Sequence, residues 1–165
     1  MKTKTIVYTA LLGAFTFIAS YIQIPFGGSI NFTLQTVVVI LSGLLLAPLY
    51  AMASQVITLL LLVLLRDGFG IVQKPSFGFI IGFILLAGFI AYAKPKLHLW
   101  LTLFIGECLL YSVGISYMAY ILNGQMGKNL ALSAILGLGL FPFIIPDILK
   151  AIVSVLIYKR LKKIN

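Results

Sequence analysis

Two ionisable side chains, Asp147 and Lys150, interrupt an apolar stretch at residues 141–158 that has the character of a membrane span. Charged groups are costly at this depth, and they usually mark a buried functional site in which each group has a partner. Pro146 is predicted to take the first position of a helix, which places Asp147 in the first turn, where the helix dipole favours a carboxylate. Lys150 then follows on the same face. Two interpretations stay open: an ion pair that only stabilises the start of the helix, or a site that binds a ligand.

The other reactive residues are too few for an enzyme. The chain has three acidic residues, one histidine and one cysteine, Cys108, which excludes an intrachain disulfide. It contains no serine-nucleophile, zinc-protease or phosphate-loop motif, and His98 is expected to anchor the inner end of a span. We therefore expect no enzymatic activity, no cofactor and no metal. A proton-coupled carrier or channel that uses Glu107 and Asp147 stays open as an alternative.

The composition is that of an integral membrane protein. Of the 165 residues, 62% are hydrophobic and only 9% are charged, and the mean hydropathy is +1.17. So little polar surface excludes a water-soluble domain, and residues 1–165 are expected to form a single integral membrane domain. The net charge of +9 is divided among short segments between apolar runs. This pattern indicates membrane topology, and no nucleic-acid partner is expected.

Six membrane spans are predicted, and the second apolar stretch decides this number. Residues 33–65 would reach ~50 Å as one helix, against a hydrocarbon core of ~30 Å. We expect this stretch to fold back at Gly43 and Pro48 and so to make two short spans. The other spans are predicted at residues 5–24, 77–93, 97–122 and 141–158, with a chain break after the first at Pro25, Gly27 and Gly28, and with residues 130–140 as a re-entrant or peripheral piece.

The distribution of basic residues supports six spans. With an inward N-terminus, eight Lys and Arg residues lie in segments on the inner side and three lie on the outer side. A five-span chain would place five inside and six outside. Because cytoplasmic segments are enriched in Lys and Arg, the sequence predicts an all-α membrane protein of six transmembrane helices with both termini cytoplasmic.

Three ordered motifs resemble one transporter family. Residues 31–36, Asn-Phe-Thr-Leu-Gln-Thr, resemble the Pro-Phe-Thr-Leu-Gln-Thr first-loop motif of the biotin-specific substrate-binding subunits (S components) of energy-coupling factor (ECF) transporters. Residues 142–151 are similar to that family's Pro-Phe-x-x-Gly/Pro-Asp-x-x-Lys-Ala motif, and residues 74–83 to its Gly-Pro-Thr-Gly-Gly-Tyr-x-x-Gly-Phe motif. The resemblance implies a six-helix S-component fold in the cell membrane. It also implies capture of biotin from outside and delivery inward by a transmembrane coupling subunit and two ATPases.

The resemblance also implies roles for particular residues. Asp147 would accept the ureido N–H groups of biotin, and Lys150 and Lys74 are candidates for its carboxylate. The remaining candidate ligand contacts are Arg66, Gln35, Thr33, Gln55, Phe32 and Tyr111, the last two against the apolar rings; interhelical hydrogen bonding or packing stays open for the neutral ones.

A second group of candidates concerns the partner subunit and the choice of ligand. Ala10 and Ala14 form a small-residue stripe that resembles the family's docking surface for the coupling subunit. The segment between Gln55 and Lys74 is shorter than in the family. Another small carboxylated vitamin or cofactor, such as lipoate, is therefore the alternative ligand.

Overall fold

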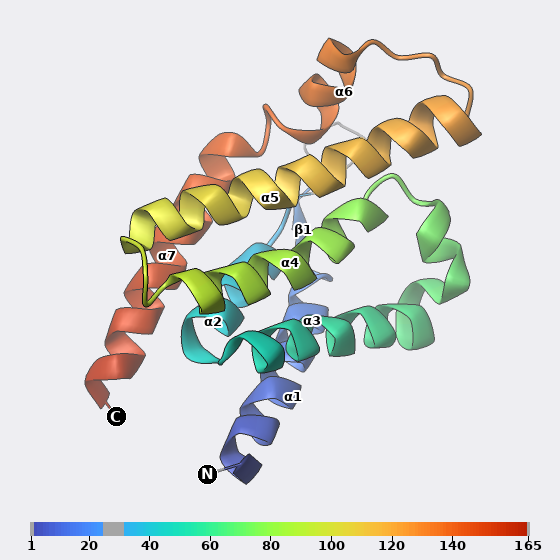
Figure 1. The fold of residues 1–165 in the computed structure, drawn as a ribbon. Coiled ribbons are helices and arrows are strands. Elements are labelled where there is room, and N and C mark those ends of the chain that lie inside the picture. Colours follow the sequence, from blue (N-terminus) through green and yellow to red (C-terminus); the bar gives the residue numbers. More distant parts are fainter. Residues whose placement is uncertain (1, 25–31, 165) are drawn as a thin grey trace.

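The chain is mostly helical in a computed structural model, which describes residues 2–24 and 32–164 (Figure 1). The predicted break at Pro25, Gly27 and Gly28 and the motif residue Asn31 lie outside the described residues. The elements in chain order are α1 (Lys2–Ala19), β1 (Gln23–Ile24), β2 (Phe32–Thr33), α2 (Gln35–Leu45), α3 (Pro48–Leu62), a π-helical turn (Val63–Asp67), a 3₁₀ helix (Gly68–Gln73), α4 (Phe77–Ala93), α5 (Leu99–Ala119), a second π-helical turn (Tyr120–Gln125), α6 (Leu132–Gly139) and α7 (Ile144–Ile164).

The predicted reversal in the second apolar stretch is confirmed, but only one of its two marker residues lies at the turn. Pro48 is the first residue of α3, a position where its missing N–H leaves no helical hydrogen bond unmade. Gly43 lies inside α2, so its assignment to the turn was wrong. A Cβ atom at Gly43 would lie 2.7 Å from Cβ of Ile90, and this glycine therefore allows α2 to approach α4 closely.

A short β-ribbon departs from the expected all-α architecture. Gln23 pairs with Thr33 and Ile24 pairs with Phe32 in an antiparallel arrangement. The first helix accordingly ends at Ala19, five residues before the predicted end of the span. The ribbon holds the start of α2 beside the end of α1.

The last helix begins earlier than predicted. α7 starts at Ile144, so Pro146 is the third helical residue and its assignment to the first position was wrong. Asp147 still lies in the first turn. Its backbone N–H donates to the carbonyl oxygen of Phe143 over 2.8 Å.

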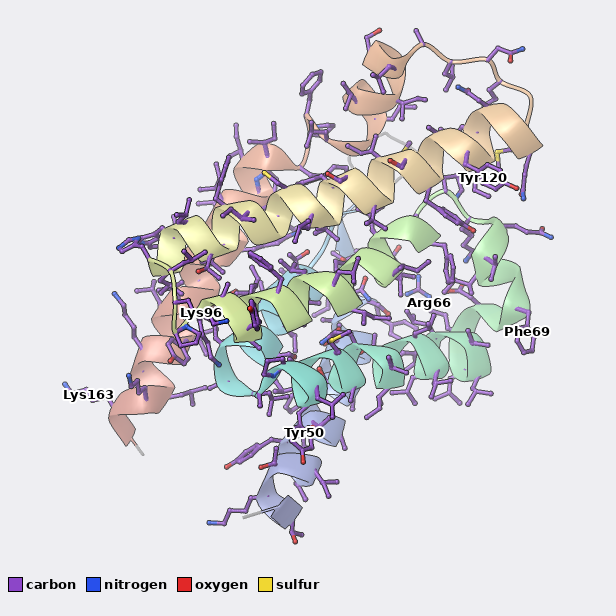
Figure 2. All side chains as sticks on the ribbon, viewed as in Figure 1. Tyr50, Arg66, Phe69, Lys96, Tyr120 and Lys163 are labelled. Carbon is purple, nitrogen blue, oxygen red and sulfur yellow. The ribbon has the colours of Figure 1, made fainter. Side chains whose placement is uncertain are left out.

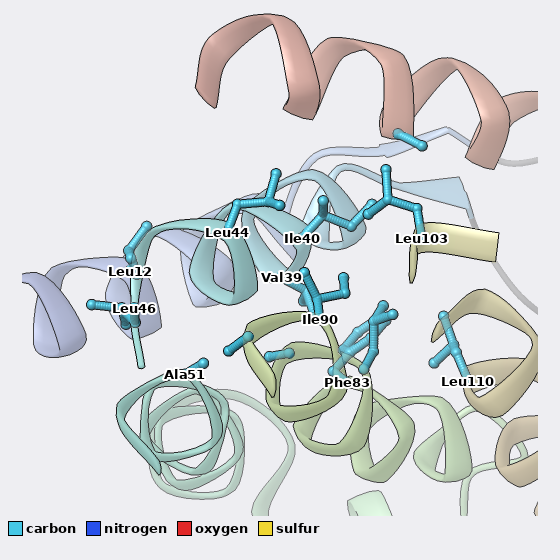
Figure 3. Packing of buried hydrophobic residues seen from close by; sticks show 14 of the residues in the cluster. Leu12, Val39, Ile40, Leu44, Leu46, Ala51, Phe83, Ile90, Leu103 and Leu110 are labelled. Atoms are coloured by element: carbon cyan, nitrogen blue, oxygen red, sulfur yellow. The ribbon is translucent and has the colours of Figure 1, made fainter. Parts of the chain in front are cut away.

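Helices α2 and α4 form the centre of the core (Figure 3). Val39 and Ile40 of α2 and Ile90 of α4 are fully buried. α4 also packs closely on α5, because a Cβ atom at Gly82 would lie 2.6 Å from Cδ1 of Leu110. Gly82 therefore allows α4 and α5 to pack directly against each other.

Lys94, at the end of α4, forms hydrogen bonds with the turn between α2 and α3. Its Nζ donates to the carbonyl oxygens of Gly43, Leu44 and Leu46 over 3.0, 2.7 and 3.1 Å. Carbonyl groups in the last turn of a helix lack helical partners, and a cation there also complements the helix dipole. Partial burial lowers the pKa of Lys94.

The exterior is apolar enough for a lipid environment. Within residues 2–24 and 32–164, three continuous helical segments are long and apolar enough to cross a membrane: Pro48–Gln73, Leu99–Gln125 and Leu132–Lys163. The shorter apolar helices are Thr3–Ala19, Gln35–Leu45 and Phe77–Ala93. Leu49, Phe69 and Phe104 are 75%, 86% and 67% exposed. Such a surface suits hydrocarbon, so the chain is a multi-pass membrane protein.

Both termini lie toward the same end of the molecule (Figure 1). Lys96 and Lys163 are found toward that end, whereas Arg66, Phe69 and Tyr120 lie toward the opposite one (Figure 2).

Candidate ligand-binding site

A cavity of about 250 Å³ lies between the helices, close to the lower limit of roughly 300 Å³ for small-molecule pockets. It combines apolar walls with a few charged and amide side chains, which is the usual construction of a small-ligand site. Its lining comprises Gln23, Thr33, Gln35, Thr36, Leu62, Arg66, Asp67, Ile71, Lys74, Ser76, Phe79, Ile80, Phe83, Leu110, Tyr111, Gly139, Phe143, Asp147 and Lys150.

A buried polar cluster on α5 and α7 forms one part of the lining. Lys150 Nζ donates to Oδ1 of Asp147 over 2.7 Å, and the two side chains are 6% and 10% exposed. The hydroxyl of Tyr111 donates to the other carboxylate oxygen, Oδ2. Lys150 Nζ also lies 4.0 Å from the ring centroid of Phe32, in a cation–π contact. Asp147 thus lies in the first turn of α7 beside an ammonium group and a phenol hydroxyl, and its two carboxyl oxygens have the capacity to accept further hydrogen bonds.

Gln35 adds an amide to the same lining. Its Oε1 accepts a hydrogen bond from the hydroxyl of Thr33 over 3.2 Å. Its Nε2 is buried and has no hydrogen-bond partner among the described residues. An unpaired buried donor carries a desolvation cost of about 1–3 kcal/mol, and a ligand acceptor would remove that cost. The β-ribbon places Thr33 here, and Gln35 follows as the first residue of α2.

A second charged group lies where the π-helical turn meets the 3₁₀ helix. Asp67 accepts a hydrogen bond from Lys74 Nζ, and Arg66 Nε lies 3.6 Å from the second oxygen of Asp67. Arg66 is also fixed to α1, since its NH1 donates to Oγ and to the carbonyl oxygen of Ser20 over 2.8 and 3.2 Å. The Lys74 side chain is 49% exposed, so this part of the cavity is its solvent-facing end.

The apolar walls come mainly from aromatic and branched side chains of α4, α5 and the segment before α7. Phe79 meets the ring of Tyr111 edge-on, with the ring centroids 6.1 Å apart. Phe83 and Leu110 lie below them in the core, and Phe143 contributes from the segment before α7. These walls suit an apolar ring system between two polar ends.

The lining carries a net charge of +1. Its cations are Arg66, Lys74 and Lys150, and its anions are Asp67 and Asp147. A ligand with one carboxylate would neutralise it. No group of three or more His, Cys, Asp or Glu side chains that could hold a metal ion occurs in the described part of the chain.

The structure brings seven of the nine predicted ligand-contact residues to this cavity: Asp147, Lys150, Lys74, Gln35, Thr33, Tyr111 and Arg66. Phe32 lies outside the lining and packs against Lys150 instead. The roles of these residues in binding remain predictions.

Gln55 does not reach the cavity. It is 1% exposed, and its Nε2 donates to the hydroxyl oxygens of Ser42 and Ser54 over 3.1 and 3.0 Å. These contacts join α2 to α3, so the alternative of interhelical hydrogen bonding describes Gln55.

Glu107 also lies outside the lining. Both of its carboxyl oxygens are buried and have no hydrogen-bond partner in the part of the chain that the structure describes. Among the described residues, no hydrogen bond links Glu107 to Asp147. The proton-coupled alternative stays a prediction.

The two predicted docking residues lie on the surface of α1. Ala10 is exposed and Ala14 is half-buried. Gly13 between them faces inward, because a Cβ atom there would lie 2.6 Å from the carbonyl oxygen of Ser54 on α3. Gly13 therefore packs against α3, whereas Ala10 and Ala14 are at least partly exposed on the surface of α1.

Sequence reasoning missed several lining residues. Phe79, Phe83 and Phe143 stand within the quoted motifs, and their aromatic character was the available signal. Asp67 was not among the predicted ligand contacts. An acid between two cations, followed by glycine, could have indicated a site.

The fold and the cavity are those of a multi-pass membrane protein with a pocket between its helices. A family model described as the BioY family matches residues 1–165. The chain belongs to the BioY family.

Relatives and a solved structure agree with this assignment. "Probable biotin transporter BioY" of Lysinibacillus sphaericus is 33% identical over 175 residues, covering 99% of this chain and 89% of the relative. The protein of the same name from Pyrococcus horikoshii is 31% identical and covers 98% of both chains. A crystal structure of the S component for biotin from an ECF-type ABC transporter is similar with a TM-score of 0.74 and 26% identity, over 98% of this chain and 92% of the other.

Proposed function

We propose that this protein is the biotin-binding S component of an ECF-type ABC transporter. It captures biotin from outside and releases it inward when partner ATPases hydrolyse ATP. Membership of the BioY family and the similarity to a solved S component for biotin support this function.

The observation that carries the proposal is the pairing of a charged acceptor with an unpaired donor in one cavity. Asp147 presents carboxylate oxygens, and Gln35 Nε2 is buried without a partner among the described residues. The ureido ring of biotin has two N–H donors and a carbonyl acceptor. Asp147 would accept the N–H bonds, which are strengthened by its charge, and Gln35 would donate to the carbonyl. One ring would then satisfy both groups.

The opposite end of biotin is a carboxylate, and the cavity offers cations for it. The Lys74 and Arg66 side chains are 49% and 26% exposed, whereas the Asp147–Lys150 pair in the same lining is buried. The net charge of +1 in the lining matches a ligand with a single negative charge. Between the two ends, Phe79 and Tyr111 would cover the apolar thioether ring and the valerate chain.

The proposed topology is six spans with both termini on the cytoplasmic side. The excess of Lys and Arg near the end that holds both termini supports this orientation. A Cys108→Ser chain with single cysteines at Lys4, Lys74 or Lys163 tests it. In intact cells, an impermeant thiol reagent is expected to label position 74 and to spare positions 4 and 163. Labelling of either terminal position before the cells are opened would contradict the topology.

The proposed partners are a transmembrane coupling subunit and two ATPase subunits. The chain itself carries no phosphate-binding loop, so the energy must come from elsewhere. Ala10 and Ala14 are proposed to lie at the interface with the coupling subunit, because small side chains let two helices approach closely within a membrane.

Calorimetry on the detergent-purified protein tests the ligand. Biotin is expected to bind far more tightly than lipoate, because lipoate has a carboxylate but no ureido donors for Asp147. Biotin amide, which keeps the ureido ring and loses the charge, is expected to bind with intermediate affinity. A folded protein that binds lipoate at least as well as biotin would contradict biotin as the ligand while leaving the fold and the family assignment unchanged.

A further inference from the structure

Asp67 is an acidic residue of the cavity for which the biotin complex described above has no use. It lies at the solvent-facing end, where the ligand carboxylate is expected, and its side chain is 13% exposed. A carboxylate at this place repels a carboxylated ligand. Its presence therefore needs a physical reason.

The contacts of Asp67 are those that an anionic ligand would make. Lys74 Nζ donates to its Oδ1, and Arg66 Nε lies 3.6 Å from its Oδ2. Arg66 is held independently by Ser20, with NH1 2.8 Å from Oγ, and its guanidinium carbon lies 5.1 Å from the ring centroid of Tyr21. Arg66 therefore has a second anchor besides Asp67, whereas Asp67 is the one polar partner of Lys74 Nζ within the described residues.

Asp67 lies at a junction between two different kinds of helix. Asp67 is the last residue of the π-helical turn Val63–Asp67, and the 3₁₀ helix Gly68–Gln73 follows directly. Gly68 has φ +60°, a conformation that favours glycine, and a Cβ atom placed there would have no neighbour within 4 Å. π-helical turns within helices often accompany functional sites. Gly68 thus connects the π-helical turn to the 3₁₀ helix, and no other atom lies close to the position of its missing side chain.

We propose that Asp67 is an internal competitor for the carboxylate of the ligand, and thereby determines how strongly the cavity favours carboxylated over neutral ligands. In the empty protein Asp67 binds Lys74 and neighbours Arg66. On ligand entry Lys74 exchanges Asp67 for the ligand carboxylate, and the same exchange runs in reverse on release. This inference rests on the proposed function, because it requires a ligand that carries a carboxylate.

The charge of the cavity indicates that Asp67 competes with the ligand carboxylate and does not help to bind it. With Asp67 charged, the solvent-facing group of Arg66, Asp67 and Lys74 has a net charge of +1, and without it the group would have +2. Asp67 therefore lowers the attraction for any anion. A transport subunit gains from this arrangement, since a ligand held by two free cations in a partly enclosed site would leave slowly.

Calorimetry on the purified full-length protein with biotin and biotin amide tests the proposal. Asp67→Asn is expected to raise the affinity for biotin roughly three- to tenfold, because Lys74 no longer has to leave a carboxylate. The affinity for biotin amide is expected to stay within about twofold, since that ligand makes no ion pair. Retained amide binding also reports that the variant is folded. Asp67→Ser, which removes the same charge with a smaller side chain, should show the same selective gain.

A double-mutant cycle tests the route through Lys74. Lys74→Gln is expected to weaken biotin binding and to spare biotin amide. In the Lys74→Gln background, Asp67→Asn should raise biotin affinity by less than about twofold, because the exchanged cation is gone. Lys128→Gln is the matched control, because it removes a lysine that lies outside the cavity lining.

The outcomes separate this inference from the proposed function. If the wild-type protein binds biotin and the Asp67 variants bind it equally or more weakly, Asp67 does not compete, and the biotin function is unaffected. An equal gain for biotin and its amide would also overturn competition. If the wild-type protein binds neither ligand, the proposed function fails, and the competitor role fails with it.

Discussion

Asp147→Asn is expected to lower the affinity for biotin by roughly a hundred- to a thousandfold, which corresponds to about 3–4 kcal/mol. The change removes the charge that strengthens the hydrogen bonds from the ureido ring. It also leaves Lys150 as a buried ammonium without the carboxylate that lies 2.7 Å from its Nζ. Calorimetry on the purified variant measures the loss.

Two further variants separate these causes. Tyr111→Phe removes only the hydroxyl group that donates to Asp147, and it is expected to weaken the binding free energy of biotin by about 0.5–1.5 kcal/mol. Asp147→Asn combined with Lys150→Met removes the stranded charge, so it should recover thermal stability without recovering biotin affinity. Biotin affinity within about threefold of wild type in a folded Asp147→Asn protein would contradict the role of Asp147 as the charged acceptor.

Ala14→Trp is expected to abolish biotin uptake in cells that contain the coupling subunit and the ATPases, and to leave biotin binding to the purified protein within about threefold. Ala14 is half-buried on α1 and does not belong to the cavity lining. An indole there prevents the close approach that small residues permit between membrane helices. The same result is expected for Ala10→Trp, because Ala10 is exposed.

The matched control is Phe15→Trp, which places the same indole on α1 at a position that is already occupied by an exposed aromatic side chain. This variant should transport normally. Copurification with the coupling subunit should fall with the alanine variants and persist with Phe15→Trp. Equal losses of binding and uptake in Ala14→Trp would show that the indole damages the fold, and normal uptake would remove α1 from the interface.

Much of the helical order follows from hydropathy and from proline. Apolar runs of the observed lengths can satisfy their backbone groups in lipid only as helices, and so α4 begins and ends where the sequence predicts. Pro48 marks the start of α3 because proline is compatible with the first turn of a helix. The spacing of Asp147 and Lys150 is likewise a local property, since residues three apart on a helix share a face.

The details of packing were beyond such reasoning. The sequence predicts Gly43 at a turn. In the structure it lies inside α2 and packs against Ile90, which lies 47 residues further along the chain. Gln55 has the chemistry of a ligand contact, but Ser42 and Ser54 bind it within the core. A β-ribbon of two residues per strand has too short a pattern to be predicted.

The composition and the motifs alone establish a membrane protein with an acid–base pair at the start of its last helix, because hydrophobicity and helical spacing are properties of neighbouring residues. Only the tertiary structure decides which side chains face one cavity. Tyr111 reaches Asp147 across 36 positions of sequence, and Arg66 is fixed by Ser20 across 46. Such contacts depend on how the helices pack, which is set by close fits between distant side chains. The same packing leaves Gln35 Nε2 without a hydrogen-bond partner among the described residues and places Asp67 beside Lys74.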